Sequence, residues 1–260
     1  MRGNKRKTLS FAQIVCHSFA FAFPRGSGLD SRQQRTQQTL SVSPALARAI
    51  PFGIYIAFLV VESLLPREGL GFDLRWLYAV KIVCVAIALG WLWNRYSELR
   101  AQPKTGVGSW ALSLAVGVVI FVVWIVLDQP WAVMGTPGGW NPANSSGEIS
   151  WALVAVRLAG AVAVVPVMEE LFWRSLVLRW TRNSDFLSVA PAHAGAVALI
   201  VSSLLFGLEH HEWLAGIIAG LAYAGTYMRT GNLWCAVVAH AVSNLLLGVW
   251  VVQTGQWQFW

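Results

Sequence analysis

Charged residues are scarce in this chain of 260 residues, and their scarcity is its clearest compositional feature. Only 12% of the residues are Asp, Glu, Lys or Arg, whereas 56% are hydrophobic, and the mean hydropathy is +0.56. A soluble domain carries about 25% charged residues. The composition therefore excludes a soluble globular protein and predicts one that lies mostly within a membrane.

Cysteine is also rare. The three cysteines, Cys16, Cys84 and Cys235, are far apart in the sequence, and two of them stand in apolar runs. A structural zinc site or a disulfide framework depends on cysteines at short, regular spacings. We therefore expect neither, and interpret the cysteines as small buried apolar side chains.

Positive charge is concentrated at the N-terminus. Residues 1–44 hold seven Lys or Arg residues and one Asp, a net charge of +6 out of +7 for the whole chain. The apolar run at 11–24 is short and lacks a small-residue cleavage site, which disfavours a signal peptide. We interpret residues 1–44 as a basic, poorly ordered tail near anionic lipid. Because no motif or aromatic context accompanies the charge, we expect no nucleic-acid partner.

Seven stretches are apolar and long enough to cross a bilayer, which takes about 20 residues per helix. They cover residues 46–65, 74–93, 109–127, 150–180, 187–209, 213–228 and 233–251. They predict an all-α fold, a polytopic membrane helix bundle of about seven transmembrane helices. We divide it into an N-terminal three-helix region at 45–149, a second membrane region at 150–251 and a C-terminal tail at 252–260.

The basic residues between these stretches predict the orientation, because cytoplasmic loops carry an excess of Lys and Arg. Alternate connections are basic, through Arg95, Arg100, Lys104, Arg182 and Arg229. The connection at 128–149 has no basic residue. We therefore expect a multi-pass protein of the cell membrane, with its N-terminus in the cytoplasm and its C-terminus outside.

Three charged residues stand alone within the predicted spans. Glu62 and Lys81 lie in the first two, and Arg157 lies in the fourth. Because an unpaired charge is costly in hydrocarbon, we expect these side chains to pair, as Glu62 and Lys81 can, or to extend toward the interface. They indicate structure rather than chemistry.

Two adjacent carboxylates, Glu169 and Glu170, stand in one of the most apolar stretches of the chain. Arg174 follows Glu170 by four residues, so the two share a helical face and can pair, whereas Glu169 points about 100° away. The pattern is consistent with an ordinary interfacial Glu–Arg pair. It is equally consistent with a site in which Arg174 holds one carboxylate and the other acts as a base.

Two further pairs of residues have the same helical spacing. Phe206 and His210 share a face near the end of the fifth stretch, and His240 and Asn244 share a face in the seventh. Glu209 and His211 adjoin His210 and can lie at the interface. Taken singly, each pair is also explained by hydrogen bonds between helices.

Together, these pairs resemble the motifs of the type II CAAX prenyl endopeptidase and bacteriocin-processing family, also called CPBP or Abi intramembrane proteases. The motifs are Glu-Glu-x-x-x-Arg at 169–174, Phe-x-x-x-His at 206–210 and His-x-x-x-Asn at 240–244. The resemblance covers residues 150–251 and implies a catalytic membrane domain there. The first half of the chain resembles a bacterial subgroup that accompanies exosortase and PEP-CTERM sorting systems.

The resemblance implies an intramembrane glutamic endopeptidase acting on a membrane-anchored peptide or protein, without a covalent intermediate. The implied catalytic residues are Glu169, Glu170, His210, His240 and Asn244. The implied supporting residues are Arg174 and Phe206.

The roles that the resemblance implies divide these residues into two groups. Glu169, assisted by His210, would activate water, and His240 and Asn244 would donate hydrogen bonds to the oxyanion. Glu170 would be held by its arginine or would support its neighbour.

No cofactor is expected, and zinc is the alternative. Two histidines and a glutamate match hydrolytic zinc ligation. However, His-Glu-x-x-His does not occur in the chain, and the resemblance implies a metal-free site. A serine nucleophile is disfavoured because Ser202, Ser203 and Ser243 have no Gly-x-Ser-x-Gly context.

Two other functions stay open. A non-catalytic membrane scaffold or regulator would keep the same fold, and a proton-coupled transporter also uses Glu and His side chains. No internal repeat typical of transporters is visible. The partners that we expect are the lipid bilayer and the membrane-anchored substrate, and the sequence leaves the oligomeric state open.

One expectation conflicts with the others. If the fifth stretch is a straight helix from 187 to 209, His210 lies near the outer surface. Glu169, about 19 residues into the fourth helix, then lies near the inner surface. The two can meet only if a helix is tilted, broken or starts later.

Overall fold

The computed structural model describes residues 42–65, 72–101, 103–135, 139–144 and 146–260. Almost all of the predicted N-terminal tail, including Cys16, lies outside these residues. Within them the chain is helical, and extended pairing is limited to an isolated bridge between Ala143 and Ile149.

A helix occupies each of the seven predicted stretches. Six of them contain α2 (Pro44–Leu64), α3 (Leu77–Trp91), α5 (Val107–Val126), α9 (Ala196–Leu208), α10 (Trp213–Thr230) and α11 (Leu233–Thr254). A short helix, α4 (Ser97–Arg100), lies between α3 and α5. The predicted all-α membrane bundle is confirmed.

The fourth stretch is one continuous helix of 30 residues, Trp151–Trp180, which we call the long helix. It consists of α6 (Trp151–Ala159), α7 (Val165–Glu170) and α8 (Leu178–Trp180), joined by two π-helical segments at Gly160–Val164 and Leu171–Val177. π turns inside α-helices are frequent at functional sites. Here they flank α7, which ends in the paired glutamates.

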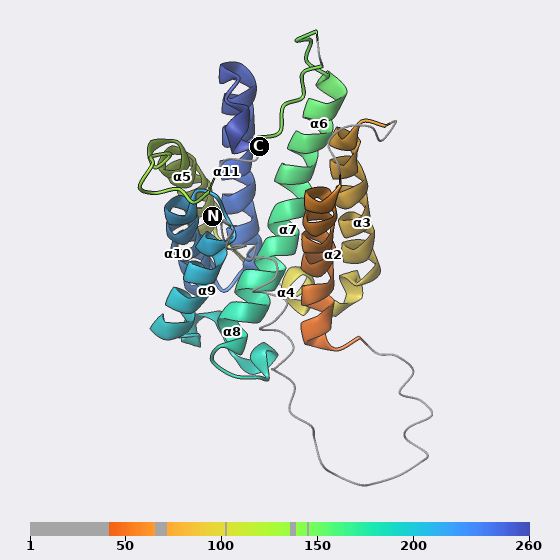
Figure 1. Ribbon diagram of the computed structural model, residues 1–260. Coiled ribbons are helices and arrows are strands. Elements are labelled where there is room, and N and C mark those ends of the chain that lie inside the picture. The colour runs from red at the N-terminus through yellow and green to blue at the C-terminus, as the bar shows by residue number, and fades with distance from the viewer. Residues whose placement is uncertain (1–41, 66–71, 102, 136–138, 145) are drawn as a thin grey trace, which may run out of the picture. The chain divides into compact units, whose positions relative to one another are not determined.

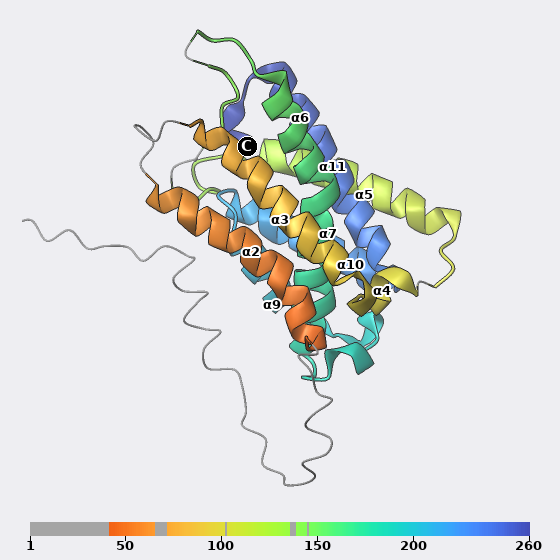
Figure 2. The same ribbon diagram turned by 90° about the vertical axis from the view of Figure 1, so that its right-hand side faces the viewer.

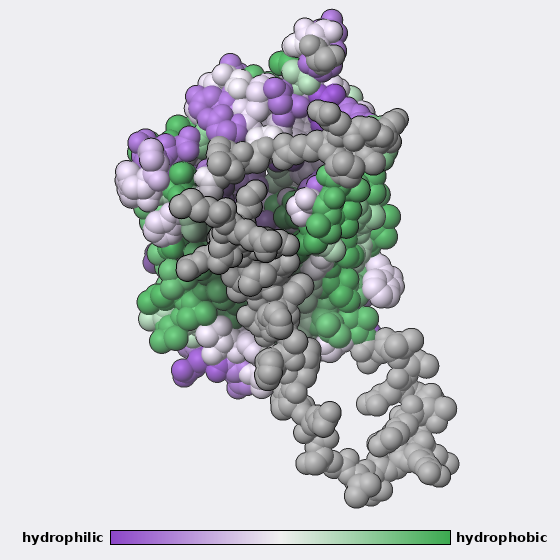
Figure 3. All heavy atoms as spheres, viewed as in Figure 1, coloured by the Kyte–Doolittle hydropathy of each residue, from purple (hydrophilic) through white to green (hydrophobic). Residues whose placement is uncertain are grey.

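Among the residues that the structure describes, five helices are long and apolar enough to cross a membrane, namely α2, the segment Leu74–Trp91, α5, the long helix and α11. Large apolar side chains are exposed along them, for example Ile87 (65%) and Val119 (58%). Apolar side chains cover the middle of the visible surface, and hydrophilic ones gather at its two ends (Figure 3). A bilayer solvates such a surface, so the protein is integral to a membrane.

The helices form two groups, with the long helix between them (Figures 1 and 2). On one side α2 packs against α3. On the other, α5 packs against α10 and α11, and α9 packs against α10. The long helix contacts α2 through its second π segment and α11 through α7. This arrangement brings the faces that carry the polar motifs together.

The fifth helix starts later than the sequence predicted. Instead of a helix from 187, the chain forms two 3-10 turns, Phe186–Ser188 and Pro191–His193, and α9 begins only at Ala196. Gly195, with φ +88°, holds the chain in a conformation that few other residues adopt and so prevents earlier helix growth. With 13 residues, α9 is about 20 Å long, shorter than the roughly 30 Å hydrocarbon core. The later start removes the conflict between His210 and Glu169.

Small residues let α9 and α10 approach closely. A Cβ at Gly216 would lie 2.8 Å from the Cα of Gly207, and one at Gly220 would lie 2.8 Å from the Cα of Ser203. Glycines four residues apart are typical of tight helix contacts in membranes. This contact fixes the position of the C-terminal half of α9, which carries Phe206.

Of the isolated charges predicted within the spans, Glu62 and Lys81 pair as expected. The Nζ atom of Lys81 lies 3.3 Å from Oε2 of Glu62. Arg157 instead lies between two aromatic rings, with its Cζ 4.7 Å from the ring centre of Tyr78 and 5.0 Å from that of Trp140. The ring faces supply the cation–π stabilisation that a carboxylate would otherwise give.

A buried cluster joins the N-terminal end of α2 to the end of the long helix. Arg48, which is fully buried, donates from Nε to Glu98 at 2.6 Å and to Ser175 at 3.0 Å. Burial acts to raise the pKa of the Glu98 carboxyl, but the hydrogen bonds and charge of Arg48 outweigh it, and the pKa lies below its usual value. The carboxylate therefore stays ionised and compensates the buried arginine.

The close approach of α9 and α10 gives a stability prediction. Gly220→Ala forces a methyl group against the backbone of α9 and is expected to destabilise the protein by about 1–3 kcal/mol. Gly225→Ala, on the same helix, is the matched control, because a Cβ there meets no atom within 4 Å. Thermal unfolding in detergent compares the two, and equal midpoints for both variants would contradict the packing described.

Candidate active site

The Glu170 carboxylate, with 0% exposure, holds the polar interior together. Its Oε2 lies 3.0 Å from Nε of Arg174, which confirms the predicted pair four residues apart. Its Oε1 lies 2.9 Å from Nδ1 of His240, so the imidazole donates to it. One carboxylate thus links the long helix to α11.

Arg174 rests on aromatic rings rather than on further oxygens. Its Cζ lies 4.2 Å from the ring centre of Phe206 and 5.4 Å from that of Tyr223. Its Nη1 and Nη2 have no hydrogen-bond partner among the described residues. The cation is therefore stabilised by one carboxylate and two ring faces, which explains the position of Phe206.

The imidazole ring of His240 is contacted at its edge by Glu170 and on its face by Tyr223. Tyr223 stacks on the imidazole at 4.9 Å between ring centres, with an angle of 15° between the planes, and its hydroxyl is 2.6 Å from Ser243 Oγ. With Nδ1 engaged by Glu170, Nε2 is the nitrogen left to act. It lies 3.9 Å from Oε2 of Glu169.

Glu169 is the less constrained of the paired glutamates. It is 7% exposed, and its Oε2 has no hydrogen-bond partner among the described residues. A buried carboxylate oxygen without a donor is costly, so few proteins keep one without a use for it. This division between a held Glu170 and an available Glu169 agrees with the helical geometry predicted from the sequence.

His210 follows the end of α9, and its tautomer is fixed by the backbone. Its Nδ1 lies 2.8 Å from the carbonyl oxygen of Phe206, which only accepts, so Nδ1 carries the proton. Nε2 of the neutral ring then carries the lone pair of a base. The rings of Phe206, at 4.8 Å, and Trp124, at 5.3 Å, enclose the imidazole.

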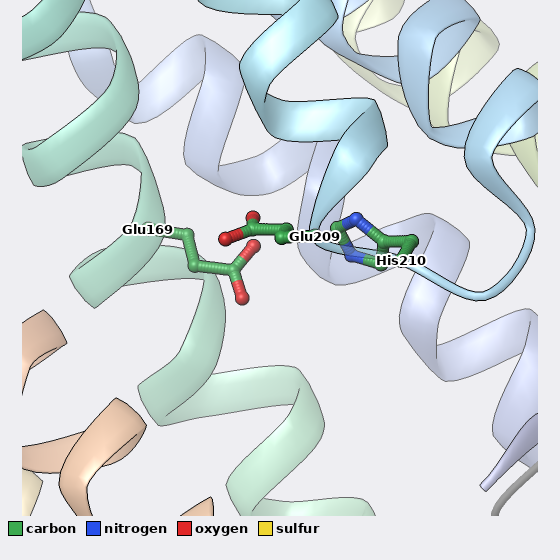
Figure 4. A group of neighbouring side chains, drawn as sticks. All are labelled: Glu169, Glu209 and His210. Atoms are coloured by element: carbon green, nitrogen blue, oxygen red, sulfur yellow. The ribbon is translucent and has the colours of Figure 1, made fainter. Parts of the chain in front are cut away.

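Glu209, which the sequence left without a role, lies at this site and is partly buried. A carboxylate oxygen of Glu169, one of Glu209 and a ring nitrogen of His210 all lie within 4.8 Å of one another (Figure 4). Trp173 Nε1 donates to Glu209 Oε1 at 2.9 Å. The sequence signal was present, since Glu209 is one of only 12 acidic residues and directly precedes His210.

The same three residues are the group of potential metal ligands among the described residues. The zinc alternative from the sequence assumed two histidines and one glutamate. The geometry gathers two glutamates and one histidine instead, because His240 Nδ1 is already bonded to Glu170. Zinc accepts carboxylate and imidazole ligands alike, so the donor set is chemically suitable.

Asn244 lies one helical turn beyond His240, and its Nδ2 donates to the carbonyl oxygen of Ala161 at 2.8 Å. Two features leave this carbonyl without a helical donor. The N–H of Val165 bonds to Gly160 in the π segment, and Pro166 has no N–H. Because an amide group has two N–H bonds, Asn244 keeps one for another acceptor.

The fold and the site define a polytopic α-helical membrane protein with carboxylates, imidazoles and an amide enclosed between its helices. Residues 150–246 match the model of a protein family described as Type II CAAX prenyl endopeptidase Rce1-like. Searches of curated proteins and of solved structures gave no match.

All three motifs lie within the matched residues, so residues 150–246 form a region that matches the CAAX protease (CPBP) family. A match to this family supports protease, and hence hydrolase, activity. The structure thus brings six of the motif residues together, and Asn244 lies one helical turn beyond His240. The six are Glu169, Glu170, Arg174, Phe206, His210 and His240.

The dependence of this interior on Glu170 can be measured. Glu170→Gln leaves Arg174 buried without a carboxylate and is expected to destabilise the protein by about 3–5 kcal/mol. Adding Arg174→Met removes the uncompensated charge and should recover much of this loss. Thermal unfolding in detergent measures both, with the exposed Glu148→Gln as control. A double variant no more stable than the single one would show that Glu170 does not compensate a buried charge on Arg174.

Proposed function

We propose that the protein is a metal-free endopeptidase that cleaves a membrane-anchored peptide or protein with water activated by Glu169. The single observation that carries this proposal is the state of Glu169. Its carboxylate is buried, has an oxygen without a hydrogen-bond partner, and lies beside the imidazole of His210. A carboxylate so placed is a ready proton acceptor.

In the first step Glu169 takes a proton from water while the water oxygen attacks the carbonyl carbon of the scissile peptide bond. The fixed tautomer of His210 supports a role beside Glu169, because its Nε2 can accept a hydrogen bond from the same water. No bond forms between the protein and the substrate in this step.

The negative charge that develops on the carbonyl oxygen is stabilised by His240 and Asn244. For His240 to donate from Nε2 while Nδ1 is bonded to Glu170, the ring must carry both of its protons, and the Glu170 carboxylate is placed to compensate that charge. Asn244 offers the N–H that is not bonded to Ala161. In other enzymes, loss of one such donor lowers kcat about 10²–10³-fold.

The setting that we propose is the cell membrane, with the N-terminus in the cytoplasm. A substrate anchored in the same bilayer reaches the site by lateral movement, which fits a protein whose helices expose their apolar faces to lipid. The chemistry described requires an accessible peptide bond and leaves the nature of the anchor open.

The defining experiment measures cleavage of a panel of membrane-anchored peptides by detergent-purified protein. Glu169→Gln should lower kcat about 10²–10⁴-fold, because it removes the base but preserves the shape of the side chain. Glu148→Gln, an exposed carboxylate in the connection before the long helix, should leave kcat unchanged. A metal chelator should have no effect on the wild-type protein.

Three outcomes would overturn the proposal. Full activity of Glu169→Gln would show that Glu169 is not the general base. Loss of activity with chelator and recovery with zinc would assign Glu169, Glu209 and His210 to a metal site. Absence of cleavage across the panel would favour a scaffold or a transporter.

A further inference from the structure

The steps above use one carboxylate of the site and leave Glu209 without a role. Glu209 caps the C-terminus of α9, at the junction where the helix gives way to His210. Its carboxylate points toward that of Glu169, which approaches from the long helix (Figure 4). Oxygen atoms of the two lie within 4.8 Å of each other.

The charges around the two carboxyl groups are unequal. Glu169 Oε2 lies 3.9 Å from Nε2 of His240, on the side of the imidazole opposite to Glu170. Glu209 has instead a neutral donor, the indole N–H of Trp173 at 2.9 Å. The imidazole of His240, which carries a positive charge in the proposed mechanism, thus lies beside Glu169, whereas these contacts give Glu209 only a neutral donor.

Two further effects favour a neutral Glu209. Glu169 is buried and Glu209 is partly buried, so two negative charges this close repel each other and favour a pair that retains one proton. The C-terminus of a helix carries partial negative charge, which disfavours an ionised carboxylate at that end of α9. The proton is thus held on Glu209, while Glu169 stays ionised.

We propose that Glu209 is the general acid of the peptide hydrolysis, and that it forms a proton-sharing pair with Glu169. The inference rests on the proposed function, since it needs Glu169 as the base. Once Glu169 has taken a proton from water and the tetrahedral intermediate has formed, the O–H of Glu209 donates its proton to the peptide nitrogen. The C–N bond breaks, the electron pair of that bond stays on nitrogen, and a neutral amine leaves.

The pair then returns to its starting state. Glu209 is now ionised and Glu169 is protonated, so a proton returns from Glu169 to Glu209 through a water molecule between the two carboxyl groups. Counted over the cycle, water supplies a hydroxyl to the new acid and a hydrogen to the amine. No other reactant is required.

A change of leaving group tests this role. Two membrane-anchored substrates are compared that differ only in the scissile bond, one a peptide bond and the other an aryl ester. An amine must be protonated to leave, whereas a phenolate needs no proton from the enzyme. Glu209→Gln should lower kcat for the peptide about 10²–10⁴-fold and leave ester hydrolysis near the wild-type rate.

Two controls separate this effect from structural damage. Glutamine keeps a carbonyl oxygen for the Trp173 N–H, so the thermal midpoint of Glu209→Gln should match that of the wild type. Glu169→Gln should lose activity on both substrates, because both need the activated water. Equal losses on the two substrates in Glu209→Gln, or no loss on the peptide, would overturn the assignment of Glu209.

A measurement without substrate tests the shared proton. An infrared difference spectrum between the wild type and Glu209→Gln at neutral pH should contain the carbonyl stretch of a protonated carboxyl group, and its absence would overturn the inference. The failures are distinguishable. If Glu169→Gln stays active, the proposed function fails and this inference fails with it. If Glu169→Gln is inactive but Glu209→Gln cleaves the peptide normally, only the role of Glu209 is refuted.

Discussion

The structure of the site depends on one requirement, that a charge buried among apolar helices must be compensated. Glu170 meets this requirement for Arg174 and also accepts a hydrogen bond from His240, which lies on a different helix. Because Arg174 also rests on Phe206 and Tyr223, the ion pair connects the long helix with α9, α10 and α11. The site residues are consequently positioned by the same contacts that make burial of the charges tolerable.

The irregular hydrogen bonding of the long helix also positions a side chain of the site. Two π segments flank α7, and Pro166 withholds the donor that the carbonyl of Ala161 would otherwise find. Asn244 fills this place from α11 and is thereby oriented for the remaining N–H. A regular helix would satisfy the carbonyl internally and leave the asparagine without this anchor. The same side chain therefore joins two helices and offers a donor to the site.

Most of the fold was predictable from composition, because apolar stretches of about 20 residues have few alternatives to membrane helices. The pairing of Glu170 with Arg174 followed from helical spacing alone. The start of α9 was not predicted, because the 3-10 turns before Ala196 are as apolar as a helix would be. Contacts between helices could not be read from the sequence, so the place of Glu209 at the site and the support of His240 by Tyr223 were missed. The sequence indicated the role of Glu209 only locally, because it is an acidic residue next to His210 in a chain with few acidic residues.

In the proposed reaction Glu169 activates water directly, and no bond forms between the protein and its substrate. Mass spectrometry of the products formed in the presence of hydroxylamine tests this directly, because hydroxylamine intercepts acyl-enzyme intermediates but competes poorly with a water molecule held at the site. If water attacks directly, the N-terminal product carries only a free carboxylate. A hydroxamate at that position would reveal a covalent acyl intermediate and contradict direct attack by water.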